Sequence, residues 1–264
     1  MAAISSAYES SFDCEKYHRL FYTLDPSVAA PSELPAIKER LRFLHEFYSE
    51  VSPQDARFLE FGGGPTVYSL ISVAPFTQSI VFTDISEAAL GEIRRWKEQQ
   101  PDALNFTSLF TYVVEELEGK SEEEAKRRED RLRPLITELI RCDMRQPSPL
   151  FDGSYKSQFD IVSVHFCLCC SESTDEYAAH VKRLADLIRP GGYLLLSDCL
   201  EETVCTFQEE KIPRPLFLTR EGLLGSIRNA GLEVLKEKMV YTQEGDEITD
   251  STQQLLVAAQ KRVI

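Results

Sequence analysis

Residues 58–72 read FLEFGGGPTVYSLIS, and this stretch decides the fold class. Residues 57–61 predict a short buried strand, and the apolar residues 66–73 predict a helix after the three glycines. Glycine lets a chain turn sharply and brings its backbone close to a ligand, while free N–H groups at a helix start hold polar ligand atoms. A purely structural turn needs the same residues. The stretch therefore predicts a strand–turn–helix unit of an α/β protein, with a candidate ligand site at the turn.

Beyond this unit the chain keeps alternating between strands and helices. Strands are predicted at residues 79–84, 139–142, 159–166 and 193–197, helices at residues 87–99, 175–188 and 219–230, and a closing pair of strands at residues 232–240 and 253–259. Such alternation gives a mostly parallel sheet with helices on both faces. Because such a sheet binds ligands beyond the carboxyl ends of its strands, the polar residues that follow the strands are the candidate site residues.

Two segments fall outside this alternating core. Residues 1–50 have helical spacing of aromatic side chains, which predicts an N-terminal helical cap. Residues 115–133 read EELEGKSEEEAKRREDRLR; they form either a docking arm or a solvated helix between the second and third strands, and the helix is the favoured interpretation. With 264 residues and no linker rich in glycine, serine or proline, the chain is expected to form one domain.

The charge balance argues against some classes of partner. Asp and Glu number 43 against 29 Lys and Arg, a formal net charge of −14, which disfavours nucleic acid and anionic membrane surfaces because both require basic patches. No apolar run approaches the roughly 20 residues of a membrane span, and residues 1–12 lack the pattern of a secretory signal. The seven cysteines are not spaced as a disulfide framework, so a cytoplasmic location is expected. Cys167 and Cys170 have C-x-x-C spacing, but no second pair completes a zinc site, and no metal is expected.

Two acidic positions follow predicted strands at spacings that suit an adenosine-containing cofactor. Asp84 ends the second strand roughly 20 residues after the glycines, where a carboxylate accepts hydrogen bonds from both ribose hydroxyls. Asp143 follows the third strand; it either accepts a hydrogen bond from the adenine amino group, with Met144 packing on the ring, or is an ordinary surface acid. Val67 occupies the place of the third glycine of the dinucleotide fingerprint, which disfavours a nicotinamide or flavin cofactor.

The sequence resembles the nicotinamide, phenylethanolamine and indolethylamine N-methyltransferase family, which also contains a thioether S-methyltransferase. The likeness is carried by residues 58–72, by VFTDIS at 81–86, RCD at 141–143 and RPGGY at 189–193, and by the tyrosines near the N-terminus. It covers nearly the whole chain, and GPTVY at 64–68 is its most specific part. It implies a Rossmann-like methyltransferase fold with a mostly parallel seven-stranded sheet, and S-adenosylmethionine as cofactor. Residues 1–264 would form a single methyltransferase domain, with a helical cap at 1–50 and the core at 51–264.

The resemblance also assigns cofactor contacts. It implies that Tyr17, Tyr22 and Tyr68 hold the methionine part, that Gly62 and Gly63 approach it by their backbones, and that Asp84, Asp143 and Met144 hold the adenosine. By spacing alone, ordinary packing of an amphipathic helix is the favoured interpretation of Tyr17 and Tyr22. His165, at the end of the fourth strand, either assists proton removal, since the unperturbed pKa of histidine is near 6.5, or only lines the cofactor pocket.

Methyl transfer from a sulfonium to an amine is an in-line displacement, for which the protein supplies alignment and a dry site. Asp198, at the end of the fifth strand, is the candidate that orients the amine and stabilises the developing positive charge. The alternative for Asp198 is a strand-end acid that faces water. Tyr17 is the second catalytic candidate, and the candidate substrate contacts are Phe21, Phe166, Cys169 and Arg214.

Three of these positions depart from the family pattern. Cys169 stands near the place where the amine enzymes of the family carry a second acid, which disfavours nicotinamide itself as the acceptor. Phe21 replaces a tyrosine. Arg214 stands where a small polar residue would contact substrate, and it either makes that contact or pairs with the acidic surface.

Three functions are consistent with these residues. The favoured one is N-methylation, by a monomer, of a small amine of the pyridine, arylalkylamine or indolethylamine type. The second is S-methylation of a thioether or thiol, which needs no acid to manage a proton. The third is a noncatalytic S-adenosylmethionine-binding protein that regulates a partner. The missing second acid favours sulfur, whereas Asp198 favours nitrogen.

Overall fold

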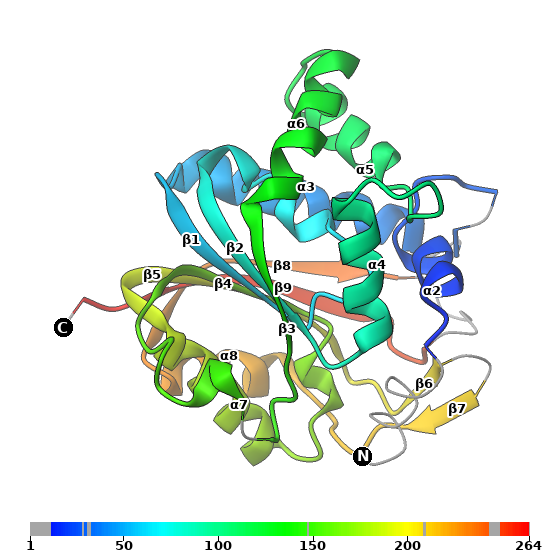
Figure 1. Ribbon diagram of the computed structural model, residues 1–264. Helices are drawn as coiled ribbons and strands as arrows, with labels where there is room; N and C mark the ends of the chain where they lie inside the picture. The colour runs from blue at the N-terminus through cyan, green and yellow to red at the C-terminus, as the bar shows by residue number, and fades with distance from the viewer. Residues whose placement is uncertain are drawn as a thin grey trace.

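A twisted seven-stranded sheet runs through the middle of the molecule (Figure 1). The computed structural model describes residues 12–27, 29–30, 33–146, 148–207, 210–242 and 249–263. In this part of the chain the strands of the sheet are β1 (Ala56–Phe61), β2 (Thr77–Asp84), β3 (Ile136–Arg141), β4 (Phe159–His165), β5 (Ile188–Leu200), β8 (Leu232–Tyr241) and β9 (Gln253–Lys261). Their order is β3-β2-β1-β4-β5-β9-β8, and β9 runs antiparallel to both of its neighbours. The expected mostly parallel sheet with a closing strand pair is confirmed.

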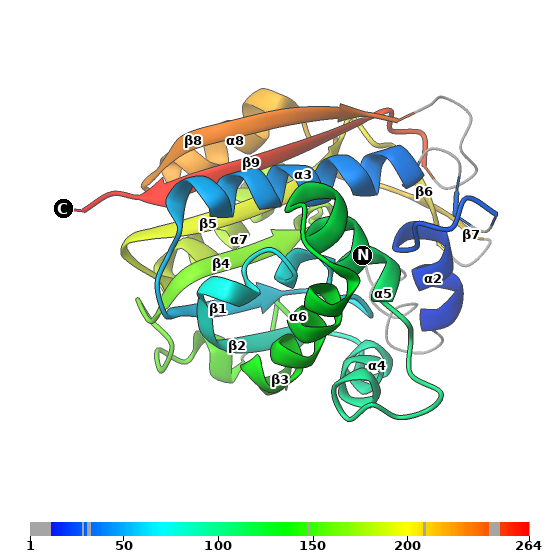
Figure 2. The ribbon, with the colours of Figure 1, turned by 90° about the horizontal axis from the view of Figure 1, so that it is seen from above.

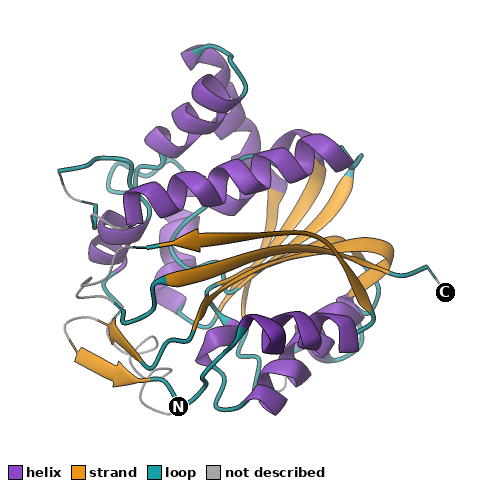
Figure 3. Ribbon diagram, turned by 180° about the vertical axis from the view of Figure 1, so that it is seen from behind, coloured by secondary structure: helices purple, strands orange, loops and turns teal. Residues whose placement is uncertain are grey.

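Helices cover both faces of this sheet. The described helices are α2 (Cys14–Phe21), α3 (Glu33–Val51), α4 (Glu87–Lys97), α5 (Thr107–Thr111), α6 (Glu122–Leu135), α7 (Thr174–Leu187) and α8 (Arg220–Asn229). Figure 3 shows the long helix α3 across one face and the pair α7 and α8 across the other. Figure 2 shows the short helix α2 beyond the arrow tips of β1 and β4, over the carboxyl ends of the parallel strands.

The central strands alternate their side chains between the two faces. Phe58 and Phe82 pack in the apolar layer beneath α3 and α4, whereas Leu59 and Val81 pack in the layer beneath α7 and α8. Successive side chains of a strand point to opposite faces, so a strand covered on both sides needs a continuous apolar run. The sequences of β1 and β2 provide it, and their burial aligns the carboxyl ends at one edge.

The segment after the glycines does not form the expected helix at residues 66–73. It forms two short 3₁₀ turns, η1 (Tyr68–Leu70) and η2 (Ala74–Phe76), and residues 65–74 are buried throughout. An α-helix on the surface of a sheet has one solvated face, which a fully buried segment lacks. Pro75 in the second turn also removes a backbone donor that a longer helix would need. The helix prediction was therefore wrong in type, although the chain turns where expected.

Other element boundaries differ from the expectations at their ends. Strand β3 begins at Ile136, and β5 begins at Ile188 and continues through the Pro-Gly-Gly sequence that was expected to precede it. A two-stranded hairpin of β6 (Val204–Phe207) and β7 (Glu210–Pro213) was not anticipated. These strands lie outside the main sheet, and their short sequences carry no strong alternation.

The charged run forms the expected helix between the second and third strands. A π-helical turn, η3 (Tyr112–Leu117), precedes α6, whose start is closed by a capping box of Ser121 and Glu124. Arg128 on its inner face pairs with Glu118 at 2.8 Å and donates to the backbone oxygen of Ile71 at 3.1 Å. The helix is thus solvated on one side and anchored to the core on the other. Across the described residues, every helix is too short or too polar to cross a membrane.

Candidate active site

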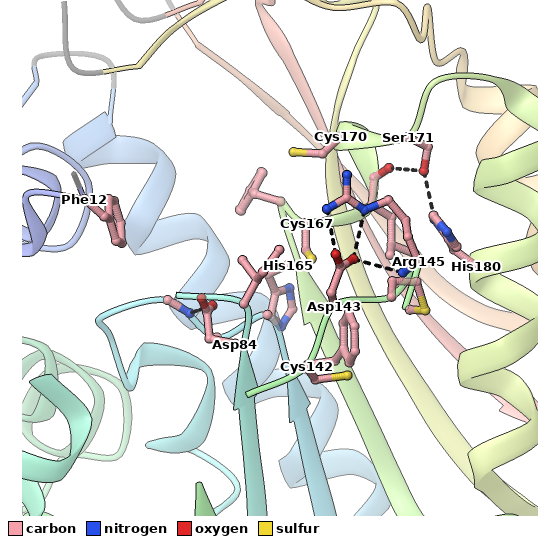
Figure 4. A pocket seen from close by; sticks show the side chains of 18 of the residues that line it. Phe12, Asp84, Cys142, Asp143, Arg145, His165, Cys167, Cys170, Ser171 and His180 are labelled. Atoms are coloured by element: carbon pink, nitrogen blue, oxygen red, sulfur yellow. Dashed lines mark hydrogen bonds and ion pairs between the residues drawn. The ribbon is translucent and has the colours of Figure 1, made fainter. Parts of the chain in front are cut away.

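A pocket opens beyond the carboxyl ends of β1, β2, β3 and β4, with an empty volume of about 940 Å³ that includes its open mouth (Figure 4). Its floor comes from the residues that follow these strands, and its roof comes from the N-terminal segment. The lining residues are Phe12, Tyr17, Tyr22, Phe61, Gly62, Gly63, Gly64, Asp84, Ile85, Cys142, Asp143, Met144, Arg145, His165, Phe166, Cys167, Leu168, Cys170, Ser171 and His180. Nine of the fourteen site residues predicted from the sequence lie in this lining, including every residue named for the cofactor except Tyr68.

The glycine turn forms the part of the floor that follows β1. Gly62 and Gly64 have φ values of +63° and +62°, a region that side-chain-bearing residues rarely adopt. A Cβ atom on Gly63 would stand 2.3 Å from Cζ of Phe82, so the backbone there passes directly against the neighbouring strand. A Cβ atom on Gly64 would meet nothing within 4 Å. The turn is therefore tight toward the sheet and open toward the pocket.

Asp84 at the end of β2 is fixed by backbone donors. The Gly64 N–H donates to its Oδ2 at 2.8 Å, and the Ser86 N–H donates to its Oδ1 at 2.7 Å. Burial raises the pKa of Asp84 to about 6, and these backbone hydrogen bonds oppose that rise. A carboxylate oxygen has two lone pairs, so each oxygen retains capacity to accept a ligand hydroxyl.

Asp143 and Met144 follow β3 and line the same pocket. Arg145 closes back on Asp143, donating from Nε to Oδ1 and from Nη2 to Oδ2, both at 2.8 Å (Figure 4). Partial burial acts to raise the pKa of Asp143, but the hydrogen bonds and charge of Arg145 outweigh it, and the pKa is lowered. Asp143 is therefore an ionised, half-buried acid rather than a free surface group. Arg145 was not identified from the sequence as the partner of Asp143, because an arginine two positions after an acid is not a distinctive pattern.

A row of aromatic rings connects the roof to the floor. Ring centroids are 5.7 Å apart for Tyr17 and Tyr22, 5.3 Å for the stacked Tyr22 and Tyr68, and 5.6 Å for Tyr68 and His165. Tyr68 lies behind the pocket wall and is buried. The guanidinium of Arg40 sits 5.9 Å from the Tyr68 ring, so the row also has a cationic neighbour. The three tyrosines named for the cofactor are thus brought together, two in the lining and one directly behind it.

His165 is held on both sides by hydroxyl groups. Its Nε2 lies 2.9 Å from Oγ of Ser163, and its Nδ1 lies 2.9 Å from Oγ of Ser197. Burial, aided by the positive charge of Arg40, lowers the pKa of His165 to about 3. A ring whose two nitrogens are occupied and whose pKa is this low is a poor proton acceptor at neutral pH. The geometry supports the lining role of His165 over proton removal.

Asp198 near the end of β5 is buried behind the wall formed by residues 167–170. The Tyr177 hydroxyl donates to Oδ2 at 2.9 Å, and the Cys169 N–H donates to Oδ1 at 3.3 Å. Burial raises the pKa of Asp198 to about 7, while the hydrogen bond from Tyr177 acts to lower it. Only 1% of Asp198 is exposed, so it does not face water as a strand-end acid would. Tyr177 was missed because a tyrosine on an amphipathic helix carries no sign of its partner.

The four candidate substrate residues lie in different surroundings. Phe166 lines the pocket with φ of +53°, and the Arg40 guanidinium lies 4.9 Å from its ring. Phe21 packs on Tyr17, with ring centroids 4.7 Å apart, and is not part of the pocket lining described above. Cys169 lies behind that lining, beside Asp198. Arg214 pairs with Glu202 at 2.8 Å in the interior, so it does not pair with the acidic surface.

Comparisons with known proteins agree over almost the full length. The model of the NNMT/PNMT/TEMT family matches residues 2–262. Nicotinamide N-methyltransferase of Homo sapiens is 27% identical over 247 residues, which cover 91% of each chain. Indolethylamine N-methyltransferase of Mus musculus is 27% identical, covering 87% of this chain and 85% of its own. Phenylethanolamine N-methyltransferase of Bos taurus is 28% identical, covering 100% and 93%.

Solved structures support the fold. Magnesium protoporphyrin IX methyltransferase from Synechocystis, with bound S-adenosylmethionine, matches with a TM-score of 0.59 and 12% identity, covering 98% of this chain and 96% of its own. The N-methyltransferase NodS from Bradyrhizobium japonicum matches with a TM-score of 0.54 and 16% identity, covering 87% and 98%. The expected Rossmann-like methyltransferase fold is confirmed.

Proposed function

Because the chain belongs to the NNMT/PNMT/TEMT family, it is an S-adenosylmethionine-dependent methyltransferase, and we propose that it methylates the nitrogen of a small amine with Asp198 beside the acceptor. The observation that carries this proposal is the buried carboxyl of Asp198 directly behind the pocket wall, with its pKa raised to about 7. A group of this pKa holds or releases a proton near neutral pH, which suits an acceptor that becomes cationic.

The pocket residues fit the adenosyl part of the cofactor. The open space at Gly64 leaves room for a ligand against the backbone of the turn. Asp84 presents a buried carboxylate for the ribose, and Asp143 presents an ionised one for the adenine amino group, with Met144 buried beside it. We infer that the roof residues Tyr17 and Tyr22 hold the methionine part of the cofactor. S-adenosylmethionine supplies an activated sulfonium methyl group.

The residues on the acceptor side of the pocket orient the acceptor and stabilise the charge that develops on it. The aromatic roof and Phe166 exclude water and orient a flat or apolar acceptor. The amine approaches Asp198 at the wall formed by residues 167–170, where the Cys169 N–H donates to the carboxyl at 3.3 Å. The carboxylate then stabilises the positive charge that develops on nitrogen, while Tyr177 keeps the carboxyl in position. Tyr17 lies at the pocket roof, and we infer that it orients the acceptor from there.

The decisive experiment is transfer of a labelled methyl group to a panel of pyridines, arylalkylamines, indolethylamines and thioethers. We expect turnover of at least one amine by the native protein, and a loss of about a hundredfold or more in kcat/KM for Asp198→Asn. Calorimetry should show unchanged affinity of this variant for S-adenosylhomocysteine, because Asp198 does not touch the adenosyl site. Asp152→Asn, an exposed acid, serves as the matched control.

Each outcome of the panel decides between functions. Undiminished amine turnover in Asp198→Asn would remove Asp198 from its role. Turnover of thioethers alone would favour S-methylation. The cysteine near the place of a second acid, Cys169, is consistent with this outcome, because S-methylation needs no acid to manage a proton. Tight binding of S-adenosylhomocysteine without turnover of any acceptor would leave the noncatalytic regulatory function. We also expect nicotinamide to be methylated more slowly than arylalkylamines, because Cys169 stands near the place of the second acid.

We infer from the acidic balance that the partner is a small molecule rather than nucleic acid. The expectations that residues 1–264 act as a single methyltransferase domain, that the protein works as a monomer, and that it is cytoplasmic remain proposals. Light scattering of the purified protein tests whether it is a monomer, because a monomer has the mass of one 264-residue chain.

A further inference from the structure

A thiol paired with a guanidinium forms part of the pocket wall, and methyl transfer does not use it. Cys170 lines the pocket, and Nη1 of Arg214 donates to its Sγ at 3.1 Å. Figure 4 shows the Cys170 sulfur turned away from Ser171. Arg214 is itself buried, with 9% of its side chain exposed, and its Nε lies 2.8 Å from Glu202. The arginine therefore has fixed partners on both sides and holds its charge against the sulfur.

The surrounding groups favour the thiolate form of Cys170. A hydrogen bond from the Cys169 thiol is the largest cause of its lowered pKa, burial acts in the opposite direction, and the charge of Arg214 lowers it further. The pKa of Cys169 is raised by the same hydrogen bond, so Cys169 is the member of the pair that stays protonated. The negative charge of Glu202 faces the cluster and offsets part of the effect of Arg214.

The other cysteines lie in the opposite situation. Burial raises the pKa of Cys14 to about 12 and that of Cys205 to about 11. The pKa values of Cys142, Cys167, Cys169 and Cys199 are raised as well. Because the thiolate is the reactive form, Cys170 differs from the six other cysteines of the chain, whose raised pKa values keep them protonated at neutral pH.

We propose that Cys170 is a nucleophilic thiol at the pocket wall that hydrogen peroxide oxidises, and that its oxidation stops methyl transfer. The second half rests on the proposed function. The thiolate attacks one peroxide oxygen, an S–O bond forms as the O–O bond breaks, and hydroxide leaves. Sulfur is oxidised to sulfenic acid, the peroxide is reduced to hydroxide, and an acid of the buffer protonates this hydroxide to water.

The position of Cys170 explains why this oxidation would stop turnover. A sulfenic acid is neutral, so Arg214 would lose the anion that faces its Nη1. Cys170 also follows Cys169, whose N–H holds the Asp198 carboxylate. A larger group at Cys170 therefore disturbs both the pocket wall and the acid behind it. Cys205, which packs in the same small apolar cluster, lies nearby but is protonated and buried.

The first test measures labelling and needs no activity. The folded protein is treated with limiting iodoacetamide, and peptide mass spectrometry follows all seven cysteines. We expect Cys170 to react about tenfold faster or more than any other cysteine at pH 7. Arg214→Gln should slow this reaction severalfold and move its pH midpoint upward, while Arg214→Lys should retain part of the rate. Preferred labelling of another cysteine, or an unchanged rate in a folded Arg214→Gln protein, would overturn the proposal.

The second test links the thiol to turnover. Each protein is treated with hydrogen peroxide, and its activity is compared with its own untreated sample, so differences in basal rate cancel. Native protein and the matched control Cys14→Ser should lose activity, and thiol reductant should restore it. Cys170→Ser should keep its activity under the same treatment. Equal inactivation of Cys170→Ser would overturn the regulatory half, whereas labelled Cys170 in a protein that methylates no amine would contradict only the proposed function.

Discussion

Gly63 and Gly64 are neighbours in the turn after β1, yet an added methyl group would meet different surroundings at each. At Gly63 the added methyl group would lie 2.3 Å from the Phe82 ring, in a closely packed core that cannot accommodate it. At Gly64 it would meet nothing within 4 Å, and only the φ of +62° opposes it. Gly63 is therefore required by packing, and Gly64 by backbone conformation and by ligand access.

This contrast gives a paired prediction. Gly63→Ala should lower the free energy of unfolding by about 1–3 kcal/mol, because it overpacks the core. Gly64→Ala should cost only about 1 kcal/mol, the strain of a left-handed backbone, but should still weaken cofactor binding because its methyl group enters the pocket. Urea unfolding and calorimetry with S-adenosylhomocysteine separate the two effects. Equal loss of stability in both variants would contradict the packing argument.

The carboxyl of Asp198 makes a second residue-scale prediction, which concerns pH. Its pKa of about 7 implies that the ionised fraction, and with it kcat/KM, rises between pH 6 and pH 8. The Tyr177 hydroxyl acts to lower this pKa, so Tyr177→Phe should move the midpoint upward by about one unit. Tyr155→Phe removes a similar hydroxyl–carboxylate bond, to Glu138 on the surface, and should leave the profile unmoved. An unshifted midpoint in Tyr177→Phe would exclude this role for Asp198.

At this scale the sequence allowed some positions to be predicted and not others. Asp84 was identifiable because the length of one strand–helix–strand unit fixes the spacing between the glycine turn and the next strand end. Tyr177 and Arg214 were not, because their importance lies in contacts with Asp198 and Cys170 that join distant segments. Such contacts between distant segments depend on how the helices and loops pack on the sheet, and a local sequence pattern does not predict them.

Among the elements, α2 differs from the long helices because it covers the pocket rather than a face of the sheet. Phe12, Tyr17 and Tyr22 come from this helix and its flanks and form the pocket roof. The short α2 has one buried residue, Cys14, so its tertiary contacts alone hold it weakly. A ligand beneath the aromatic rings would supply contacts that the helix otherwise lacks.

We therefore expect ligand binding to stabilise α2 selectively. Hydrogen exchange of backbone amides in residues 14–22 should slow by about tenfold or more when S-adenosylhomocysteine is bound. Exchange in α6, which is anchored by the Arg128–Glu118 pair far from the roof, should change little and serves as the internal control. Uniform slowing across both helices would instead indicate global stabilisation and argue against a ligand-dependent roof.

The elements also show which sequence patterns are reliable. Strands β1, β2 and β4 were predictable because continuous apolar runs between turn signals mark strands buried on both faces. The failure at residues 66–73 has the same origin: a fully buried segment is apolar on all sides, so its pattern cannot distinguish a helix from a sequence of tight turns. The hairpin of β6 and β7 was not found because its strands are short and lie away from the core sheet.

At the scale of the whole molecule, the notable feature is the number of carboxyl groups kept in the interior. Burial raises the pKa of Glu60 to about 8, opposed by hydrogen bonds from Ser163 and Ser69, and it raises the pKa of Asp198 to about 7. Asp84 follows at about 6. The formal net charge of −14 counts these groups as ionised, so the folded, ligand-free protein is less acidic at neutral pH than its composition suggests.

This arrangement fixes the sign of a stability change with pH. The folded-state pKa of Glu60 is about 8 and its ordinary value is 4.5, so the folded protein keeps a proton that the unfolded chain releases in this window. The stabilisation is fully present below pH 4.5 and is lost as the pH rises toward 8; Asp198 and Asp84 act in the same direction. The contribution of Glu60 to the free energy of unfolding should therefore fall between pH 5 and pH 8, by up to about 1.4 kcal/mol per pH unit, whereas His165 and Cys170, whose pKa values are lowered to about 3 and about 6, contribute with the opposite sign. Urea unfolding at several pH values measures this slope. Glu60→Gln should change this slope, and Glu123→Gln, at an exposed glutamate on α6, serves as the matched control and should not. A slope that Glu60→Gln leaves unchanged would mean that Glu60 is already ionised within the core.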